Sequence, residues 1–326
     1  MSYPLVNIIM SVYNSEEWIN YSVKSILNQT YKNIELIVID DCSTDNTKTI
    51  LESYNDSRIK LVLNNKNMGL TNNLNHALFL CKGKYVARMD ADDIAYENRI
   101  EKQVYFLETH EEIDVLGTQI KVFGKSNSKI KYPSKHLDIV AAMCFYNPIA
   151  HPSVIMRFDT RKNLFLYDIS IKKAQDYDLW CKLSNKIKFA NLKKTLLKYR
   201  VHSSQISSNN QSEQNEYSFK IRMKYLTNHG LSTDNVMKLF NIESNNQIDL
   251  TILYEYTLIL SQLQNFEKKS LIKQITAQKL KLIISSNNSY LSKILLISHT
   301  KILFVLPYII SRLFRRLIFP IRKSKE

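Results

Sequence analysis

Three carboxylates stand within four positions of this 326-residue chain, at Asp90, Asp92 and Asp93. They directly follow an apolar run over residues 85–89, which is preceded by the turn residue Gly83. A short apolar run with aromatic and β-branched members predicts a buried strand. Neighbouring carboxylates repel one another, so they stay ionised at low cost only where they face water or a cation. Oxygen ligands suit Mg²⁺ and Mn²⁺, and the pattern therefore predicts a divalent metal that carries a phosphorylated ligand. An acidic turn that caps the next helix is the alternative.

The elements around this run alternate between strand and helix. Buried strands are predicted at residues 6–12, 36–39, 59–63 and 85–89. Apolar residues at helical spacing predict the intervening and following helices: Ile19, Val23, Ile26 and Leu27; Ile50, Leu51 and Tyr54; Leu70, Leu74, Ala77 and Leu78; Ile100, Val104 and Leu107. Asn14 with Glu17, and then Ser43, are placed to cap the first two helices. This order is typical of a doubly wound parallel sheet.

Three strand ends carry polar clusters, at residues 11–14, 40–45 and 90–93. Parallel strands end at one edge of a sheet, where open α/β sheets bind their ligands, so the clusters are expected to converge. The first strand is followed by no G-x-G-x-x-G, and the chain has no G-x-x-x-x-G-K-[ST]. These absences argue against a dinucleotide fold and a P-loop NTPase.

The alternation weakens after about residue 112. Strands are expected at 115–123 and 153–158, a short helix at 174–183, and two strands within 187–199. Residues 203–215 are rich in Ser, Asn and Gln, which indicates a loop or domain edge. Helices are expected from residue 216 onward, and Gly230 is a candidate C-cap.

Composition limits the classes of protein. The chain is 44% hydrophobic and can bury a core. Its 4 cysteines show no C-x-x-C pair and no metal-ligand spacing, as expected for reduced thiols in a cytosolic protein.

The net charge of +15 is unevenly distributed along the chain: residues 1–100 hold 10 Lys and Arg against 12 Asp and Glu, whereas residues 301–326 hold 7 basic residues against one acid. The end of the chain is therefore expected to be attracted to a polyanion.

Residues 302–320 combine large apolar side chains with Arg312, Arg315 and Arg316, and Pro307 interrupts the run. A membrane-spanning helix needs about 20 mostly apolar residues, so the segment better fits an interfacial helix on an anionic membrane. A C-terminal helix that packs back on the domain is the alternative. Nucleic-acid binding is not expected, because the tail lacks a matching motif and residues 1–100 are slightly acidic.

Several motifs in order resemble the family 2 glycosyltransferases, which are inverting enzymes with a GT-A fold. They are NIIMSVYN from Asn7, SILNQT from Ser25, ELIVIDDCSTD from Glu35, NMGL from Asn67, GKYVARMDADD from Gly83, HPSV from His151, AQDYDLW from Ala174 and YRVH from Tyr199. The resemblance spans roughly residues 4–208. It implies an α/β protein with a GT-A, Rossmann-like nucleotide-sugar-binding sheet and a C-terminal helical extension.

The resemblance also implies a domain organisation. Residues 1–208 would form the GT-A domain, with a nucleotide-binding half over about 1–112 and an acceptor half over about 113–208. Residues 209–326 would form the helical extension, which ends in the basic apolar segment.

In such enzymes the first two strand ends hold the nucleotide. By that resemblance Tyr13 would stack on the base, Ser11 would contact it, and Asp41 would accept a hydrogen bond from a pyrimidine ring nitrogen. Asp90 would contact the ribose or the metal. Asp92, the second acid of the D-x-D motif, would ligate the Mn or Mg ion that bridges the diphosphate.

The resemblance makes Asp176 the general base, since inversion needs a carboxylate opposite the leaving group. The family usually has Glu-Asp where this chain has Gln175-Asp176. Asp178 is the rival base. His202 would complete the metal shell, and Arg200 would pair with phosphate or brace its loop. His151 is expected to shape the acceptor cleft or to serve the structure, and no chemistry is expected of Cys42, where the family often has Gly.

The implied function is transfer of a sugar from a nucleotide-diphosphate sugar, expected to be a UDP-sugar, to a hydroxyl of a glycan or lipid-linked acceptor. The implied setting is surface polysaccharide or lipopolysaccharide synthesis, with the protein cytoplasmic and peripheral on the inner face of the membrane. One alternative is a sugar nucleotidyltransferase, but residues 10–17 lack the Gly, Arg and Lys of its usual loop. The other is a non-catalytic membrane-bound scaffold with the same fold, against which Asp92 and Asp176 argue.

Overall fold

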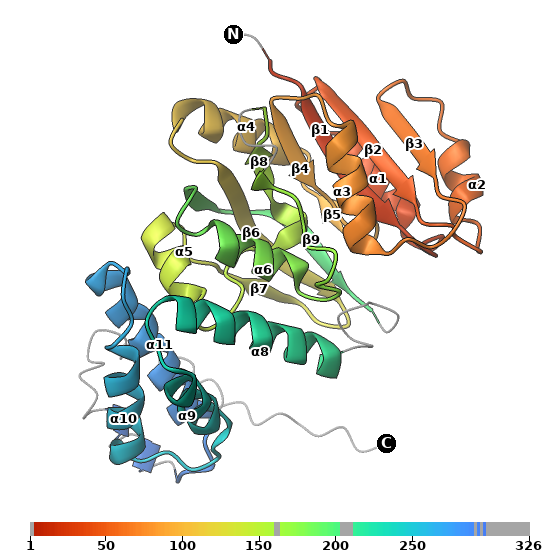
Figure 1. Cartoon of the computed structure of the whole chain (residues 1–326). Helices are drawn as coiled ribbons and strands as arrows, with labels where there is room; N and C mark the ends of the chain where they lie inside the picture. Colours follow the sequence, from red (N-terminus) through yellow and green to blue (C-terminus); the bar gives the residue numbers. More distant parts are fainter. Residues whose placement is uncertain (1–2, 160–163, 203–210, 290–291, 294–295, 298–326) are drawn as a thin grey trace. The chain divides into compact units, whose positions relative to one another are not determined.

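The computed structural model describes residues 3–159, 164–202, 211–289, 292–293 and 296–297 (Figure 1). It divides into two compact units, residues 1–225 and 226–326. The boundary expected at residue 208 falls within 203–210, outside the described residues, and stays a prediction.

The first unit begins with four parallel strands in the order β3-β2-β1-β4, which lie side by side in red and orange in Figure 1. The elements are β1 (Val6–Val12), α1 (Ile19–Leu27), β2 (Ile34–Asp40), α2 (Thr47–Glu52), β3 (Ile59–Leu63), α3 (Leu70–Leu80) and β4 (Tyr85–Arg88). The register pairs Val12 with Asp40 and Ile9 with Arg88. The three polar clusters therefore follow strand ends at one edge of the sheet, as predicted.

Both faces of these strands are covered by helices. One face packs against α1 and α4 (Arg99–Thr109). Its core includes Val6, Ile8, Met10, Val12, Leu36 and Val38 from the strands and Ile19, Val23, Ile26, Ile100, Val104 and Leu107 from the helices. Alternate strand residues such as Ile9 and Ile37 point to the opposite face and are also fully buried. Helix α3 contacts β1 and β2 with buried residues outside the first core, so it covers this second face.

Beyond β4 the sheet is mixed. The order continues β4-β8-β6-β9-β5, with β7 paired to β6. The strands are β5 (Ile94–Ala95), β6 (Val115–Gly124), β7 (Ser128–Ile130), β8 (Ile155–Arg157) and β9 (Phe189–Val201). Strand β8 is antiparallel to β4 and β6, β9 is parallel to β6, and β5 is antiparallel to β9. The prediction of a doubly wound parallel sheet is thus correct for the first four strands and does not extend past them.

Strand β9 is one strand of 13 residues, so the prediction of two strands within 187–199 is wrong. Lys193 and Lys194 in its middle are exposed and make the sequence look interrupted. The pairing with β6 continues past them, because register shifts around Gln119 absorb the mismatch.

The two predicted helix caps are also wrong. Helix α1 begins after Trp18 and α2 after Asn46, and neither of these N-cap residues makes a side-chain capping bond. The Asn14 side chain instead accepts a hydrogen bond from the Thr44 amide at 2.8 Å, and Ser43 donates to Asp40. The loops after β1 and β2 lie next to each other at the sheet edge, and their polar groups bond across to one another.

The first unit also contains α5 (His136–Ala142), the 3₁₀ turn η1 (His151–Ser153), α6 (Gln175–Leu183) and most of α8 (Gln211–Asn228). Helix α8 packs within this unit: Arg222 Nε donates to the Cys144 carbonyl at 2.5 Å and the Tyr225 hydroxyl donates to the Val140 carbonyl at 3.2 Å. The predicted helices at 174–183 and after 216 are confirmed.

The second unit is helical, with α9 (Thr233–Ser244), α10 (Leu250–Leu260) and α11 (Lys268–Ser285). Gly230 has φ +97° and donates its amide to the Thr227 carbonyl at 3.1 Å, which confirms it as a C-cap.

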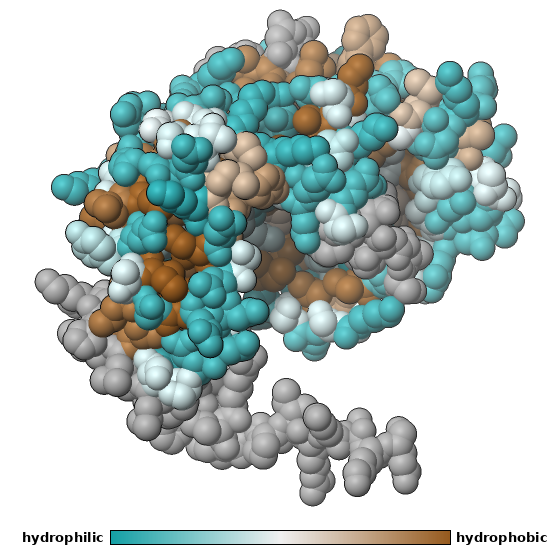
Figure 2. Space-filling view, turned by 60° about the horizontal axis from the view of Figure 1, so that its bottom comes forward, coloured by the Kyte–Doolittle hydropathy of each residue, from teal (hydrophilic) through white to brown (hydrophobic). Residues whose placement is uncertain are grey.

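The second unit has several large exposed hydrophobic residues: Met237, Leu250, Tyr254, Leu258 and Ile272. On the face drawn in Figure 2, hydrophobic residues form patches within a mainly hydrophilic surface. No helix in the described part of the chain has the length and apolarity that crossing a membrane requires. The basic apolar segment at 302–320 lies outside the described residues.

Candidate active site

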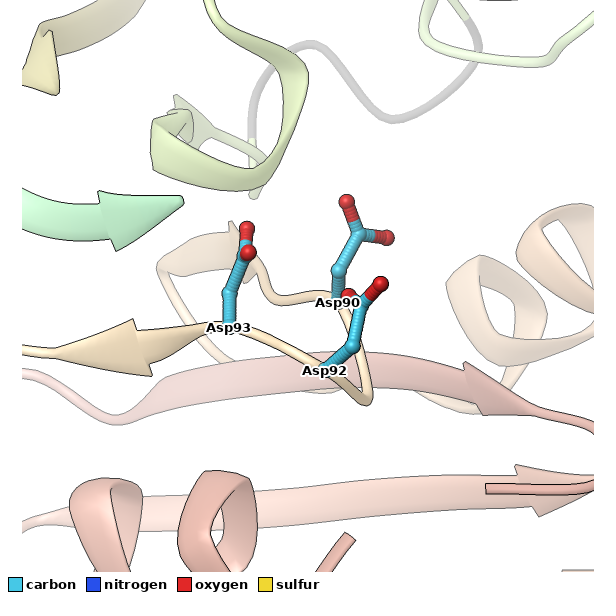
Figure 3. Close-up of side chains that lie close together, drawn as sticks. All are labelled: Asp90, Asp92 and Asp93. Atoms are coloured by element: carbon cyan, nitrogen blue, oxygen red, sulfur yellow. The ribbon is translucent and has the colours of Figure 1, made fainter. Parts of the chain in front are cut away.

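The loop after β4 gathers the three predicted acids. One carboxylate oxygen from each of Asp90, Asp92 and Asp93 lies within 4.8 Å of the other two. Figure 3 shows the three side chains extending to the same side of this loop. Asp93 is buried, and Asp90 and Asp92 are partly exposed. These residues are called the acid cluster below.

The acid cluster is electrostatically unfavourable by itself. Burial, followed by the charge of Asp90, raises the pKa of Asp92. Burial and the charges of Asp90 and Asp92 raise the pKa of Asp93 well above its usual range. Among the described residues the Asp93 Oδ2 atom has no hydrogen-bond partner. Converging, mutually repelling oxygens with an unpartnered buried acceptor fit a divalent cation with oxygen ligands.

Two buried arginines lie close to the acid cluster. Arg88, 1% exposed, places Nη2 2.5 Å from Asp90 Oδ1. Arg99 donates to the Arg88 carbonyl at 2.7 Å, and burial lowers its pKa to about 9. Asp93 was predicted only as one of the three acids, without a role of its own, and Arg88 was not predicted at all, although a single arginine at the end of an apolar strand, directly before acids, was a visible signal.

The end of β9 lies against the acid cluster. His202 Nε2 is 3.0 Å from Asp92 Oδ2. The Arg200 amide donates to Asp93 Oδ1 and its Nε donates to the Asp92 carbonyl, both at 2.8 Å. The cause is the pairing of β5 with β9, because β5 begins directly after Asp93 and pairs Ile94 with Lys198. The structure thus brings the predicted residues Asp90, Asp92, Arg200 and His202 together.

The predicted base-binding residues lie at the ends of β1 and β2. Ser11 Oγ accepts a hydrogen bond from Asn73 Nδ2 at 3.1 Å. Asn64 Nδ2 donates both to Asn73 Oδ1 at 2.8 Å and to Asp41 Oδ1 at 2.9 Å, so two asparagines link Ser11 to Asp41. Tyr13 is 48% exposed, which leaves ring surface that a base can cover.

Asp41 is only 3% exposed and already holds a loop together. Its carboxylate accepts hydrogen bonds from the amides of Met68 at 2.7 Å and Gly69 at 2.9 Å. Gly69 has φ +82°, a conformation that favours glycine. Cys42 also has positive φ, +63°, which explains why glycine suits that position. A hydrogen bond from Asp41 to a nucleotide base stays a prediction.

The two candidate bases stand in the first turn of α6, in different surroundings. Asp176 Oδ2 accepts a hydrogen bond from Asn147 Nδ2 at 2.6 Å, and burial raises the pKa of this carboxyl. Asp178 is buried and lies 2.7 Å from Lys182 Nζ in an ion pair. Asp178 is occupied by its ion pair, whereas Asp176 is partly exposed and has no cationic partner of that kind among the described residues, so the contacts favour Asp176 as the base. Asn147 is a further neighbour that sequence analysis did not select.

His151 lies in η1 and takes part in packing. Its Nε2 is 2.8 Å from the Tyr167 hydroxyl, and its ring meets Trp180 edge-on. Burial, together with the charge of Arg88, lowers the pKa of His151 well below its usual range. Burial therefore favours the neutral form of the His151 imidazole. The charge of Arg88 also acts to lower the pKa of Asp176, so this arginine influences both groups of acids.

Comparison with known proteins agrees with this geometry. Residues 7–167 match the family model described as glycosyl transferase family 2. An uncharacterized glycosyltransferase of Haemophilus influenzae is 37% identical over 79% of this chain and 87% of its own length. The UDP-Glc:alpha-D-GlcNAc-diphosphoundecaprenol beta-1,3-glucosyltransferase of Escherichia coli is 36% identical over 63% of this chain and 80% of its own length.

Solved structures share the fold at low sequence identity. S. aureus TarS in complex with UDP-GlcNAc superposes with a TM-score of 0.59 at 20% identity, over 86% of this chain and 83% of that one. A mannosyltransferase from Pyrobaculum calidifontis, in complex with GDP-Man and Mn²⁺, gives a TM-score of 0.55 at 14% identity, over 94% and 82% of the two chains.

The mixed sheet, with its parallel first four strands and the acids after β4, is the GT-A fold of glycosyltransferases. The chain belongs to glycosyl transferase family 2 and is a glycosyltransferase.

Proposed function

We propose that the protein is an inverting, metal-dependent transferase that moves a sugar from a UDP-sugar to a hydroxyl of a glycan or lipid-linked acceptor. The observation that carries this proposal is that the protein has two separate carboxylate sites. One is the acid cluster, in which Asp92 lies 3.0 Å from His202. The other is Asp176, whose pKa is raised by burial. The E. coli relative, whose name gives a UDP-Glc donor and a diphosphoundecaprenol acceptor, supports a role in surface polysaccharide or lipopolysaccharide synthesis. Residues 1–208 would carry out both binding and catalysis.

The acid cluster would hold Mn²⁺ or Mg²⁺, with Asp92 and His202 as ligands and Asp90 bound to the ribose or the metal. When bound, such a cation neutralises charge on the diphosphate leaving group. Tyr13 would stack on the base, and Ser11 and Asp41 would contact its edge. The donor is thereby held with its anomeric carbon exposed to the acceptor.

Asp176 would act as general base. Its carboxylate takes the proton of the acceptor hydroxyl while that oxygen attacks the anomeric carbon. The bond from this carbon to the diphosphate oxygen breaks, and the nucleoside diphosphate leaves from the opposite side, which inverts the anomeric centre. Burial raises the pKa of Asp176 and so makes it a better proton acceptor, and Asn147 fixes its orientation.

A donor screen tests this function. The purified protein is incubated with Mn²⁺ or Mg²⁺ and a panel of nucleotide sugars, and released nucleoside diphosphate is detected. We expect UDP release from one UDP-sugar, and inverted stereochemistry in the product. Pyrophosphate release from a nucleoside triphosphate and a sugar 1-phosphate would instead identify a nucleotidyltransferase. Absence of both donor binding and release would identify a non-catalytic scaffold.

We also propose that the protein is peripheral on the cytoplasmic face of the membrane, through residues 301–326. This proposal rests on the sequence of that segment, in which each basic residue adds roughly 1 kcal/mol of attraction to an anionic surface. Removing residues 301–326 should release the protein from anionic liposomes and leave donor hydrolysis intact. Replacing Arg312, Arg315 and Arg316 by Gln should weaken liposome binding and reduce its salt sensitivity. If the truncated protein unfolds and the full chain ignores liposomes at low salt, the segment is part of a core.

A further inference from the structure

The guanidinium of Arg200 lies over two aromatic rings. Its Cζ atom lies 4.0 Å from the ring centroid of Trp18 and 4.4 Å from that of Phe123. Trp18 precedes α1, Phe123 is near the end of β6 and Arg200 is near the end of β9, so three distant segments meet here. A cation over an aromatic face at this distance is attracted by the ring quadrupole. We call these three residues the Arg200 stack.

The Arg200 stack is joined to the acid cluster by two hydrogen bonds at 2.8 Å. Nε of Arg200 donates to the Asp92 carbonyl, and the Arg200 amide donates to Asp93 Oδ1. Trp18 has a second contact, because its ring centroid is 5.6 Å from that of His202. His202 in turn lies 3.0 Å from Asp92 Oδ2. The stack therefore contacts the main chain of one acid, the carboxylate of another and the ring of the histidine.

We propose that Trp18, Arg200 and Phe123 are positioning residues that hold Asp92, Asp93 and His202 in the arrangement that receives the divalent cation. This inference rests on the proposed function, because it assumes the metal site. Of the two roles expected of Arg200, it favours bracing over a phosphate contact, because Nε donates to the loop that carries the acids. It also gives Trp18 and Phe123 a role that neither would have as surface aromatics.

The chemistry of the side chain explains why an arginine stands here. A guanidinium is flat, so it can stack on two rings while an N–H in its plane reaches a carbonyl. A lysine ammonium keeps the charge but has neither the flat faces nor Nε. The acids need such support because their carboxylates repel one another and would separate if the loop were free.

The test is the affinity of the donor-free protein for Mn²⁺, measured by calorimetry or by the electron paramagnetic resonance of free Mn²⁺. Loss of residues that orient metal ligands typically weakens metal binding about 10–100-fold. We expect a loss of that size for Arg200→Lys and for Trp18→Leu, whereas Trp18→Phe, which keeps a ring, should stay near wild type. At saturating Mn²⁺ the variants should recover much of their kcat.

Arg157→Lys is the matched control. Arg157 also lies over an aromatic ring, 5.5 Å from the Tyr85 centroid, and donates to a main-chain carbonyl, that of Leu107, at 2.8 Å. It pairs with the first residue of β4, at the end of the strand remote from the acids. The control should lose no Mn²⁺ affinity, even if its thermal stability falls as much as that of Arg200→Lys.

Three outcomes would overturn the inference. If wild type binds Mn²⁺ and both Arg200→Lys and Trp18→Leu bind it equally well, the stack does not position the site. If Arg200→Lys raises only the KM for the donor, Arg200 contacts the diphosphate. If wild type binds no Mn²⁺ with or without UDP, the proposed metal site fails, and the inference fails with it.

Discussion

The acid cluster and the Asp176 carboxylate differ in the groups that surround them. Asp90, Asp92 and Asp93 converge within 4.8 Å, and burial, followed by the charges of neighbouring acids in the cluster, raises the pKa of Asp92 and of Asp93. Asp176 has an amide partner, Asn147, and the pKa of its carboxyl is raised first of all by burial. Repulsion between like charges is relieved by a cation, whereas desolvation of one carboxylate is relieved by a proton.

This difference supports the two roles proposed for the acid cluster and for Asp176. A site that gains from a cation suits a charged diphosphate, and a site that gains from a proton suits a general base. The ion pair between Lys182 and Asp178 argues against Asp178 as the base, because its carboxylate already has a counter-charge.

The largest expected effect comes from the acid cluster. Asp92→Asn should reduce turnover by about 10³-fold or more, because cation stabilisation of a leaving group is worth several kcal/mol. Its thermal stability without metal should stay near wild type or rise, because the substitution removes one of the repelling charges. Initial rates with and without excess chelator, together with thermal unfolding, measure both. Full wild-type activity in excess chelator would refute the metal assignment.

The next effect distinguishes the two carboxylates of α6. Asp176→Asn should still bind donor but should lose about 10²–10⁴-fold in transfer rate. Asp178→Asn is the matched control, with the same side-chain change two residues away, and its transfer rate should fall far less. Donor binding by calorimetry and single-turnover transfer separate binding from chemistry. If the control is the inactive variant and Asp176→Asn is active, the base has been misassigned.

The smallest effect concerns pH. Since burial raises the pKa of Asp176, the acidic limb of the pH–rate profile should lie above the ordinary Asp pKa of about 4. A raised folded-state pKa contributes stability below the unfolded-state pKa, and that contribution is lost as pH rises through the folded-state value. As the pH rises from acidic to neutral, wild type should lose this contribution and Asp176→Asn should not. The melting temperature of the variant minus that of wild type should therefore increase over this range. If the difference in melting temperature does not change with pH, burial does not raise the pKa of Asp176.

The sequence predicts the first four strands and their helices well because the signals for these elements are local. Each strand of β1 to β4 is a short apolar run, each helix has one apolar face, and parallel strands necessarily end at one edge. That reasoning was enough to place Asp41 and Asp90 at the same edge, and motif order was enough to predict the GT-A fold.

Other features of the first unit could not be predicted, because they depend on pairing between residues far apart in the chain. Two strands were predicted within residues 187–199, and only the bulged pairing with β6 shows that β9 is continuous. The caps expected of Asn14 and Ser43 were wrong because neighbouring loops supplied other partners. No spacing rule relates Asp92 to His202, which are 110 positions apart along the chain.

What the sequence by itself determined is the position of the first four strands along the chain, the identity of the acids after β4 and the family motifs, since these depend on neighbouring residues and on periodicity. Only the tertiary structure decided which charges are paired, which are desolvated and which aromatics stack on Arg200. The physical reason is that a pKa and a hydrogen bond depend on surroundings in space. Here those surroundings come from β5 pairing with β9, which places Arg200 and His202 beside the acids.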